Sequence, residues 1–459
     1  MNTPRLYLGI EIKVREFDAT MLLACVAAEA GFDVIIGQQR LFKQRLEEMR
    51  PGIYLDKSVT AKKTAPHASL RKSGFHIVAY DAEGLAFFDA EEYQKRRLAP
   101  ETLSQLDYFF AWGEYHANVV REKMLGHEQS IIPVGHPRID LTRRELRPFY
   151  AEEAEALRKK YGRFLLINTN FSLCNHVRGK DVAIDVLAKG GKIADETHRT
   201  YYFALREHKR KIFDAFIEMI RSVHQHFPEM PIVIRPHPIE DHDYYRQILP
   251  SDANLHVIHE GNVLPWLMAA QATIHNSCTT GIEAYLLERP VIAYQPIQAE
   301  EFDIYLPNVL SQRVFSLVSL LECLPQYFNQ EKEVRREDDE EKRNIAAFYL
   351  SGLTDQLACD RIVEALTQIL PIRNSWSVIS YRFSRMARRA ARNIFKTKAF
   401  DAPSAEFTQD KVRQQVFSGI TLTEANDILE RFQKLTGRFS SVRIIQIDED
   451  LFRLSSIHH

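Results

Sequence analysis

Two polar loops, each following a short apolar run, contain the residue types that bind and activate a phosphate. The first loop is Arg235-Pro-His-Pro238, which follows the apolar run at residues 231–234. The prolines on either side of His237 restrict the backbone, so the imidazole is presented from a rigid loop. A histidine of near-neutral pKa can donate a hydrogen bond to a phosphate oxygen or protonate a leaving one. The pattern makes His237 a candidate phosphate ligand, with an ordinary turn that contains a histidine as the alternative.

The second loop, Asn276-Ser-Cys-Thr-Thr-Gly281, lies between an apolar run at residues 272–275 and a predicted helix at 282–287. Its hydroxyl and backbone N–H groups would lie at the positive N-terminal end of that helix, where phosphate binds without a metal. Glu283, one turn inside the helix, could bind the ribose of a nucleotide. The alternative is a helix N-cap with additional hydroxyl groups. Together the loops predict a nucleotide site formed by Arg235, Pro238, Asn276, Ser277, Thr279, Thr280, Gly281 and Glu283.

A third loop, Asp81-Ala-Glu-Gly84, supplies acidic residues that the two phosphate loops lack. It follows a predicted strand at residues 75–80, and open parallel sheets bind their ligands at the carboxyl ends of strands. A carboxylate that faces the phosphate site across a cleft can act as general base toward an acceptor hydroxyl. Either Asp81 or Glu83 fits that role. The charged residues after the first predicted strand, which fit acceptor binding or a simple helix-start cluster equally well, include Glu11, Lys13 and Arg15.

Two other motifs are weaker. Asp241-His-Asp243 matches a metal-binding DxD pattern, but a solvated loop is the better interpretation in a site that needs no metal. Gly135-His-Pro-Arg138 is a second His-Pro pair, and we interpret it as a hinge between domains rather than as part of the cleft.

These loops must be positioned by an α/β fold with two sheets. Short apolar runs alternate with helical periodicity, which predicts parallel strands joined by right-handed crossovers. The organisation predicted is two Rossmann-like domains that face a central cleft, with an acceptor domain at residues 1–155 and a nucleotide domain at 156–370. A basic C-terminal extension follows at 371–459. The predicted strands lie at residues 6–12, 32–36, 53–55, 75–80, 108–112, 130–134, 164–170, 231–234, 254–258, 272–275, 290–294 and 442–447.

Composition excludes several classes of protein. A net charge of -1 over 459 residues argues against a dedicated nucleic-acid-binding protein. The five cysteines are scattered and show no CxxC spacing, which is typical of a reducing compartment without a disulfide framework or structural zinc. No segment approaches the roughly 18 apolar residues of a membrane span, and the N-terminus does not resemble a signal peptide. We therefore expect a cytoplasmic location.

The segment 372–400 is basic and contains aromatic residues but no acidic ones. Such a stretch is typical of a peripheral contact with an anionic membrane, where each basic side chain contributes about 1 kcal/mol. Packing against the acidic run at 335–342 and nucleic-acid binding are the alternatives. The residues predicted to contact the inner face of the cytoplasmic membrane are Arg382, Arg385, Arg388, Arg389 and Arg392.

The combination of an acidic loop, a His-Pro loop and a Ser/Thr-rich loop resembles the motif set of bacterial glycosyltransferases of the GT-B type. The resemblance is to the sialyl- and Kdo-transferases, which use CMP-activated acidic sugars, and it covers roughly residues 5–370. Arg235-Pro-His-Pro238 and Thr280-Gly-Ile-Glu-Ala284 also resemble CDP-glycerol-type polyol phosphotransferases. The overall pattern is similar to that of surface carbohydrate biosynthesis proteins.

The resemblance implies an inverting glycosyltransferase that needs neither a metal nor a cofactor. An acidic residue of the third loop would deprotonate the acceptor, and His237, Ser277, Thr279 and Thr280 would contact the phosphate of a CMP-linked acidic sugar such as Kdo or a nonulosonic acid. The acceptor would be a glycan or lipid-linked oligosaccharide of a capsule or O-antigen. Because Ala82 stands where the tighter pattern has a second adjacent acid, the base is either Asp81 or Glu83. The alternatives are a CDP-polyol phosphotransferase, a sugar-nucleotide 2-epimerase and a non-catalytic partner of a glycan-synthesis complex.

Overall fold

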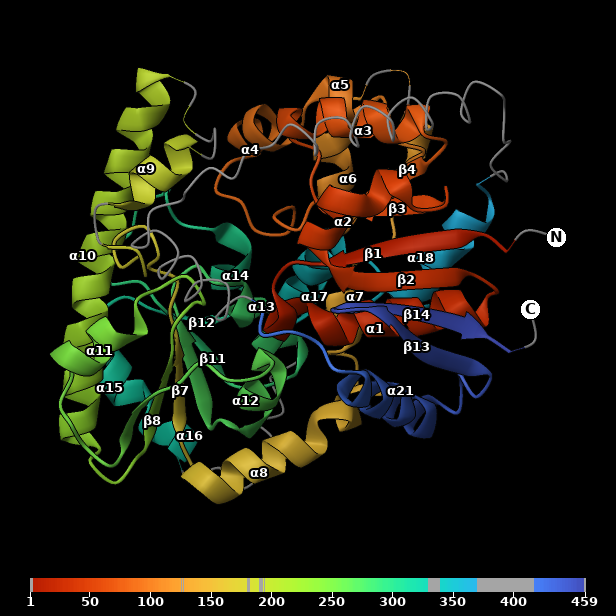
Figure 1. Cartoon of the computed structure of the whole chain (residues 1–459). Coiled ribbons are helices and arrows are strands. Elements are labelled where there is room, and N and C mark those ends of the chain that lie inside the picture. The colour runs from red at the N-terminus through yellow and green to blue at the C-terminus, as the bar shows by residue number, and fades with distance from the viewer. Residues whose placement is uncertain are drawn as a thin grey trace, which may run out of the picture.

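The computed structural model describes residues 3–124, 126, 128–179, 182–189, 193, 195–328, 339–369 and 417–457. Two α/β domains lie side by side, each built on its own mainly or wholly parallel sheet (Figure 1). The fold class predicted from the alternation of strands and helices is therefore confirmed.

The N-terminal domain contains an eight-stranded sheet in the order β13-β14-β2-β1-β3-β4-β5-β6. Strands β1 to β6 are parallel and follow one another through helical crossovers. The strands are β1 (Arg5–Ile10), β2 (Asp33–Gln38), β3 (Ile53–Asp56), β4 (His76–Ala79), β5 (Tyr108–Ala111) and β6 (Ile131–Pro133). The helices are α1 (Lys13–Glu29), α2 (Gln39–Arg45), α3 (Thr64–Lys72), α4 (Ala90–Arg97), α5 (Pro100–Leu103), α6 (Glu114–Arg121) and α7 (Pro137–Asp140).

The C-terminal domain contains a six-stranded parallel sheet in the order β12-β11-β10-β7-β8-β9. Its strands are β7 (Leu165–Asn168), β8 (Ile232–Arg235), β9 (Leu255–Val257), β10 (Ala272–His275), β11 (Val291–Tyr294) and β12 (Gln312–Val314). Its helices are α9 (Val182–Lys189), α10 (Glu196–His226), α11 (His242–Ile248), α12 (Val263–Ala269), α13 (Thr279–Leu286), α14 (Tyr305–Val309), α15 (Leu317–Cys323) and α16 (Pro325–Phe328).

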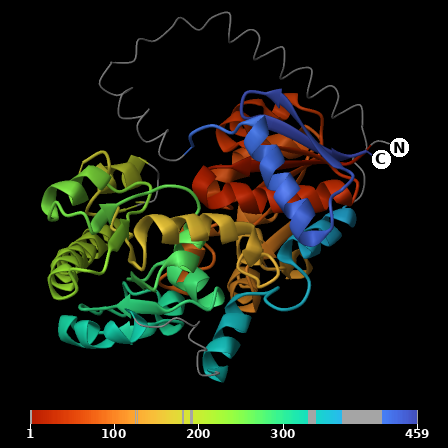
Figure 2. The ribbon, with the colours of Figure 1, turned by 90° about the horizontal axis from the view of Figure 1, so that it is seen from below.

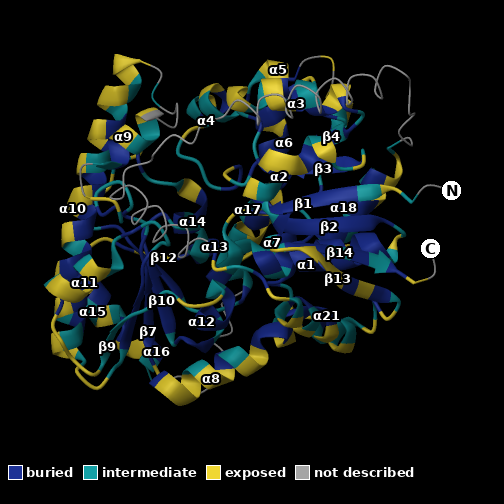
Figure 3. Cartoon of the chain, in the orientation of Figure 1, coloured by how far each residue is buried: buried dark blue, intermediate teal, exposed yellow. Residues whose placement is uncertain are grey.

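The central strands of both sheets are dark with buried residues in Figure 3, and the outer helix faces carry the exposed ones. β7, β8, β10 and β11 are buried at every position. Strands covered by helices on both faces need continuous apolar, largely β-branched runs, which is why they were recognisable in the sequence.

The chain crosses between the domains through α8 (Ala151–Tyr161) and returns through α17 (Glu340–Tyr349) and α18 (Ala358–Thr367). The Asp140 carboxylate on α7 accepts hydrogen bonds from the backbone N–H groups of Ala358 and Cys359, at 2.8 and 2.9 Å. α18 also packs on α1. We predicted that the nucleotide domain spans residues 156–370. Its last helix, α18, is instead bound to the N-terminal domain.

The described part of the C-terminal extension, residues 417–457, completes the N-terminal domain (Figure 2). It forms α21 (Leu422–Thr436), β13 (Val442–Asp448) and β14 (Leu451–Ser456). β14 pairs antiparallel with β2, and α21 packs on α1. Sequence analysis predicted the strand at 442–447, which is β13. It did not predict β14 or the pairing of β14 with β2, because nothing local in a strand specifies a partner some 420 residues away.

Candidate functional site

A cavity of about 270 Å³ lies between the two domains, at the carboxyl ends of both sheets. We call it the central cavity. The N-terminal domain lines it with residues that follow β1, β4 and β6, and the C-terminal domain with residues that follow β7, β8, β9 and β10. This is where an open parallel sheet places its ligands. The polar and charged lining residues are Arg15, Glu83, Arg138, Asn168, Thr169, Asn170, Arg235, His237, His259, Asn262, Ser277, Thr279, Thr280 and Glu283.

His237 lines the cavity in a defined tautomer. Its Nδ1 atom accepts a hydrogen bond from the backbone N–H of Ile239 at 3.3 Å, so the neutral ring carries its proton on Nε2. Burial lowers the pKa of His237 to about 4, and the nearby charge of Arg15 acts in the same direction. Burial therefore moves the pKa of His237 below the near-neutral value expected from the sequence. The neutral ring can act as a hydrogen-bond donor through Nε2.

A buried carboxylate below the loop fixes the position of His237. Glu240 accepts hydrogen bonds from the His237 backbone N–H at 2.9 Å, from the Thr169 hydroxyl at 3.0 Å and from the Tyr245 hydroxyl at 2.6 Å. Burial raises the pKa of Glu240 to about 7, against the effect of these hydrogen bonds. The network ties the loop after β8 to the end of β7, so the imidazole needs little reorganisation to meet a ligand.

The loop after β10 directs the start of α13 into the cavity. Cys278 is the N-cap residue, so Thr279 and Thr280 belong to the first helical turn rather than to the loop before it. Both threonines line the cavity together with Ser277. Their position at the helix N-terminus gives an anion backbone N–H groups, hydroxyls and the positive end of the helix dipole.

Ser277 adopts a left-handed backbone conformation, with φ at 47°. Surrounding contacts hold it there: its backbone N–H donates to Asn308 Oδ1 at 3.1 Å, and its hydroxyl accepts from Asn308 Nδ2 at 2.9 Å. Its carbonyl accepts from Asn170 Nδ2 at 3.2 Å. Residues in such conformations cost about 1–3 kcal/mol and persist where the surrounding structure determines them, commonly at functional sites.

Two residues predicted for the nucleotide do not line the cavity. Asn276 is buried, donates to the Tyr294 carbonyl at 3.0 Å and lies 3.4 Å from Lys209 Nζ. Gly281 packs on the ring of buried His275, where an added Cβ would lie 2.3 Å from Nε2. Both residues pack against buried residues of the C-terminal domain and so support the loop after β10.

Arg235 lines the cavity, but its guanidinium group binds the loop that follows β9. It is buried, and it donates to the carbonyls of Glu260 and Gly261 at 2.7 and 2.5 Å while lying over the Trp266 ring. Burial lowers its pKa to about 10. Pro238, by contrast, lines the cavity directly, as its position in the His-Pro loop predicts.

Glu283 meets a partner from the other domain. Its Oε1 atom accepts from Arg138 Nη2 at 2.5 Å, while its other oxygen is buried without a hydrogen-bond partner. Burial lowers the pKa of Arg138, although the Glu283 carboxylate opposes the shift. We interpreted Gly135-His-Pro-Arg138 as a hinge outside the cleft, but Arg138 lines the cavity and joins the two domains across it.

The structure separates the two acidic residues of the third loop. Asp81 is fully buried and accepts hydrogen bonds from the Tyr93 hydroxyl at 2.9 Å and from Arg97 Nε at 2.9 Å. Its side chain does not line the cavity. Glu83 is exposed and does line the cavity, on the wall contributed by the N-terminal domain. Only Glu83 is placed to meet a ligand there.

The acceptor candidates also separate. Arg15 lines the central cavity, whereas Glu11 and Lys13 do not. Lys13 donates to Glu424 on α21 at 2.7 Å, and the Glu11 backbone N–H donates to Glu16 at 2.8 Å. The charged residues after β1 therefore act mostly as helix-start and packing contacts.

Sequence reasoning missed the polar residues after β7 and β9. Asn168, Thr169 and Asn170 line the cavity, as do His259 and Asn262. The sequence did contain a signal for residues 168–170. This polar cluster follows an apolar run, as do the two loops predicted to bind phosphate.

The DxD motif forms a helix cap. Asp241 accepts hydrogen bonds from the backbone N–H groups of Asp243 and Tyr244, and Asp243 pairs with Arg246. Within the part of the chain that the structure describes, no group of three or more His, Cys, Asp and Glu residues is arranged to hold a metal ion. The residues predicted to contact a membrane, Arg382, Arg385, Arg388, Arg389 and Arg392, lie outside the described residues.

No protein-family model matches the sequence, and no curated protein matches it significantly. Solved structures, however, share the arrangement. The UDP-GlcNAc 2-epimerase of Methanocaldococcus jannaschii, in complex with UDP-GlcNAc and UDP, superposes with a TM-score of 0.50 and 15% identity. The match covers 79% of this chain and 99% of that one. The wall teichoic acid polymerase TagF, soaked with CDPG, gives a TM-score of 0.51 at 9% identity over 80% of this chain and 88% of that one.

The chain has a GT-B-type fold. At these identities the likeness concerns the fold alone. It agrees with the fold that the motif resemblance implies, and it does not distinguish the CMP-sugar transferases from the other enzymes built on this architecture.

Proposed function

We propose that this protein is a metal-independent, inverting glycosyltransferase that moves a sugar from a nucleotide donor onto a glycan of the cell surface. The observation that carries the proposal is the composition of the central cavity. Its C-terminal wall carries His237 and the first turn of α13, a combination suited to an anion, and its N-terminal wall carries Glu83. An anion site opposite a base is what direct displacement of a nucleotide phosphate requires.

In the proposed reaction, the acceptor hydroxyl attacks the anomeric carbon of the donor sugar and gives its proton to Glu83. The bond between that carbon and the phosphate oxygen breaks, and its electron pair remains on the departing nucleotide. His237 Nε2–H and the N–H and hydroxyl groups of Thr279 and Thr280 then stabilise the phosphate charge. In this step His237 keeps its Nε2 proton and acts as a hydrogen-bond donor to the phosphate, because its Nδ1 atom already accepts from the Ile239 backbone N–H.

Glu283 and Arg138 join the two walls of this site. Their ion pair connects α13 of the C-terminal domain to α7 of the N-terminal domain, so the geometry of the cavity depends on how the two domains pack. The buried unpaired oxygen of Glu283 remains available for a ribose hydroxyl.

We further propose that the donor is a CMP-linked acidic sugar, on the basis of the motif resemblance. A thermal-shift panel of CMP, CDP, UDP and GDP tests this, because a ligand that binds only the folded state raises the melting temperature. We expect CMP to give the largest shift, corresponding to about 2.7 kcal/mol of added stability at a hundredfold excess over Kd. A preference for UDP would discredit the CMP-sugar assignment, and no response to any of the four would contradict a nucleotide site.

The alternative reactions differ in the carboxylates they need. A sugar-nucleotide 2-epimerase would require further acids deep in the cavity. Among the described residues, the acidic side chains that line the central cavity are Glu83 and Glu283, and Glu283 is paired with Arg138. A CDP-polyol phosphotransferase would instead attack phosphorus, and a CDP preference in the panel would favour it. Nucleotide binding without transfer to any acceptor, even in cell extract that contains native lipids, would favour a non-catalytic partner.

Attachment to the inner face of the cytoplasmic membrane through residues 372–400 is part of the proposal. Within the described ranges, none of the helices is both long and apolar enough to cross a bilayer. We expect the protein to co-sediment with anionic vesicles at low salt and to be released by raised salt, because the attraction is electrostatic. Replacing the five arginines with glutamine should abolish co-sedimentation. Equal recovery with anionic and with neutral vesicles would argue against the basic segment.

A further inference from the structure

A second cavity, of about 600 Å³, opens beside the central one. We call it the side cavity. Glu83 and Ala86 line both cavities, so the two cavities adjoin at the residue proposed as the base. The volume lies within the range of about 300–1,000 Å³ that is typical of small-molecule sites. A ligand in the side cavity can therefore contact Glu83.

Both domains form the walls of the side cavity. The N-terminal domain contributes the loop after β3 and the segment from Ala86 to Arg97, which contains α4. The C-terminal domain contributes one face of α10, whose N-terminal half lies opposite α4 (Figure 1). α10 belongs to the long insertion between β7 and β8, so the wall is made by an addition to the basic β-α-β pattern.

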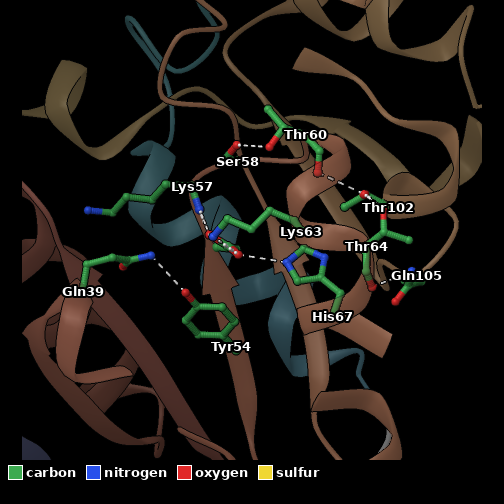
Figure 4. Close-up of polar contacts among 11 residues, drawn as sticks. Gln39, Tyr54, Lys57, Ser58, Thr60, Lys63, Thr64, His67, Thr102 and Gln105 are labelled. Atoms are coloured by element: carbon green, nitrogen blue, oxygen red, sulfur yellow. Dashed lines mark hydrogen bonds and ion pairs between the residues drawn. The ribbon is translucent and has the colours of Figure 1, made fainter. Parts of the chain in front are cut away.

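The loop after β3 is held in place by a buried polar network (Figure 4). Asp56, at the end of β3, accepts from Lys63 Nζ at 2.7 and 2.8 Å and lies 2.8 Å from His67 Nε2. Burial alone would raise the pKa of Asp56, but these two partners outweigh it and hold the pKa below its ordinary value. The Thr102 hydroxyl donates to the Thr60 carbonyl at 3.2 Å. A wall that is ordered in advance costs a ligand less free energy to bind.

Aromatic rings dominate the opposite wall. The Arg96 guanidinium lies 4.7 Å from the ring centre of Tyr201 and 4.8 Å from that of Tyr202, which joins α4 to α10 across the domain boundary. Tyr202 is buried in a cluster with Leu205, against which Phe88 packs, whereas Tyr201 is only half-buried. Tyr201 packs against the same cluster through Phe302 and lies beneath Arg96, and the part of its side chain that stays exposed lines the side cavity.

The charges of the side cavity are mixed and largely paired. Arg97 is bound to Asp81, Arg96 to Glu92, and Lys95 to Glu91. Such a lining does not select a strongly charged ligand. It suits a molecule with apolar C–H faces for the rings and a rim of hydroxyls for the polar groups, which is the chemistry of a sugar chain.

We propose that the side cavity binds the glycan acceptor, an oligosaccharide whose terminal part lies against Tyr201 and whose reacting hydroxyl reaches Glu83. This inference rests on the proposed glycosyl transfer and adds to it the place where the glycan acceptor binds. According to this proposal, α10 of the C-terminal domain contributes to acceptor specificity.

The test compares two aromatic residues on the same helix. Tyr201 lines the side cavity, whereas Phe203 is 40% exposed and does not. A printed array of bacterial capsular and lipopolysaccharide oligosaccharides is probed with four proteins: wild type, Tyr201→Ala, Tyr201→Phe and Phe203→Ala. Titration then measures the affinity for each oligosaccharide bound. Nucleotide-induced thermal shifts, measured on the same preparations, verify that each variant is folded.

We expect Tyr201→Ala to weaken oligosaccharide binding by about tenfold, the scale of one lost aromatic contact. Tyr201→Phe and Phe203→Ala should bind as wild type, and all variants should keep the nucleotide shift. Unchanged affinity in Tyr201→Ala, or wild type that binds no oligosaccharide, overturns the inference even if the nucleotide shift is intact. Oligosaccharide binding that depends on Tyr201 without any nucleotide shift supports the inference and contradicts the proposed transfer reaction instead.

Discussion

Replacing His237 with alanine is expected to reduce turnover by about 10²–10⁴-fold while leaving the fold intact. The loss follows from the geometry of the loop after β8. His237 lines the cavity with its proton on Nε2, and Glu240 holds the loop in place through the His237 backbone N–H. Alanine removes the donor and leaves the backbone contact to Glu240 unchanged. The measurement is the rate of nucleotide release from the preferred donor in membrane extract that contains acceptor lipids.

A matched control uses His226, an exposed histidine at the end of α10. His226→Ala should retain wild-type turnover, and both variants should show the wild-type circular dichroism spectrum. If His237→Ala turns over donor at a rate close to wild type, the site assignment is wrong. A loss that is accompanied by unfolding would instead show that the Nδ1 contact to Ile239 has a structural role.

Replacing Glu83 with glutamine should have an effect of comparable size, about 10²–10⁴-fold in turnover, with little change in stability. Glutamine keeps the volume and the hydrogen-bonding reach of the side chain but cannot accept the proton of the acceptor. Because Glu83 is exposed, its replacement disturbs no core packing. Donor binding should be unchanged, since the anion site lies on the other wall of the cavity.

Asp81→Asn is the matched comparison, and it should behave in the opposite way. The buried Asp81 carboxylate pairs with Arg97 and accepts from Tyr93, so its loss leaves a cation without its partner. Breaking such a pair costs about 3 kcal/mol or more, which urea unfolding would detect. A stable Asp81→Asn variant without activity, beside an active Glu83→Gln variant, would reverse the assignment of the base.

The comparison of these two acids shows how far the sequence could be interpreted. A DxEG loop after a predicted strand is enough to place both acids at the carboxyl end of a sheet, because a buried strand has a local signature. Which side chain faces the cleft depends on Arg97 and Tyr93, which lie on a helix some 12–16 residues further on. No pattern within the tetrapeptide carries that information.

Arg138 and Tyr201 illustrate the same limit across domains. Each is an unremarkable residue in its own segment, and each contributes to a cavity only because the other domain supplies the facing wall. The two polar loops after β8 and β10 were recognisable because each combines a strand end with the residue types of an anion site over a few positions.

The sequence by itself determined the two-domain α/β organisation, the described strands of both sheets other than β12 and β14, and the two loops proposed as the anion site, since hydrophobic periodicity and loop chemistry are local properties. Only the tertiary structure decided that Glu83 rather than Asp81 lines the cleft, that Arg138 meets Glu283, and that β14 closes the N-terminal sheet. The physical reason is that these features depend on which distant surfaces pack together, and packing is settled by the whole chain at once.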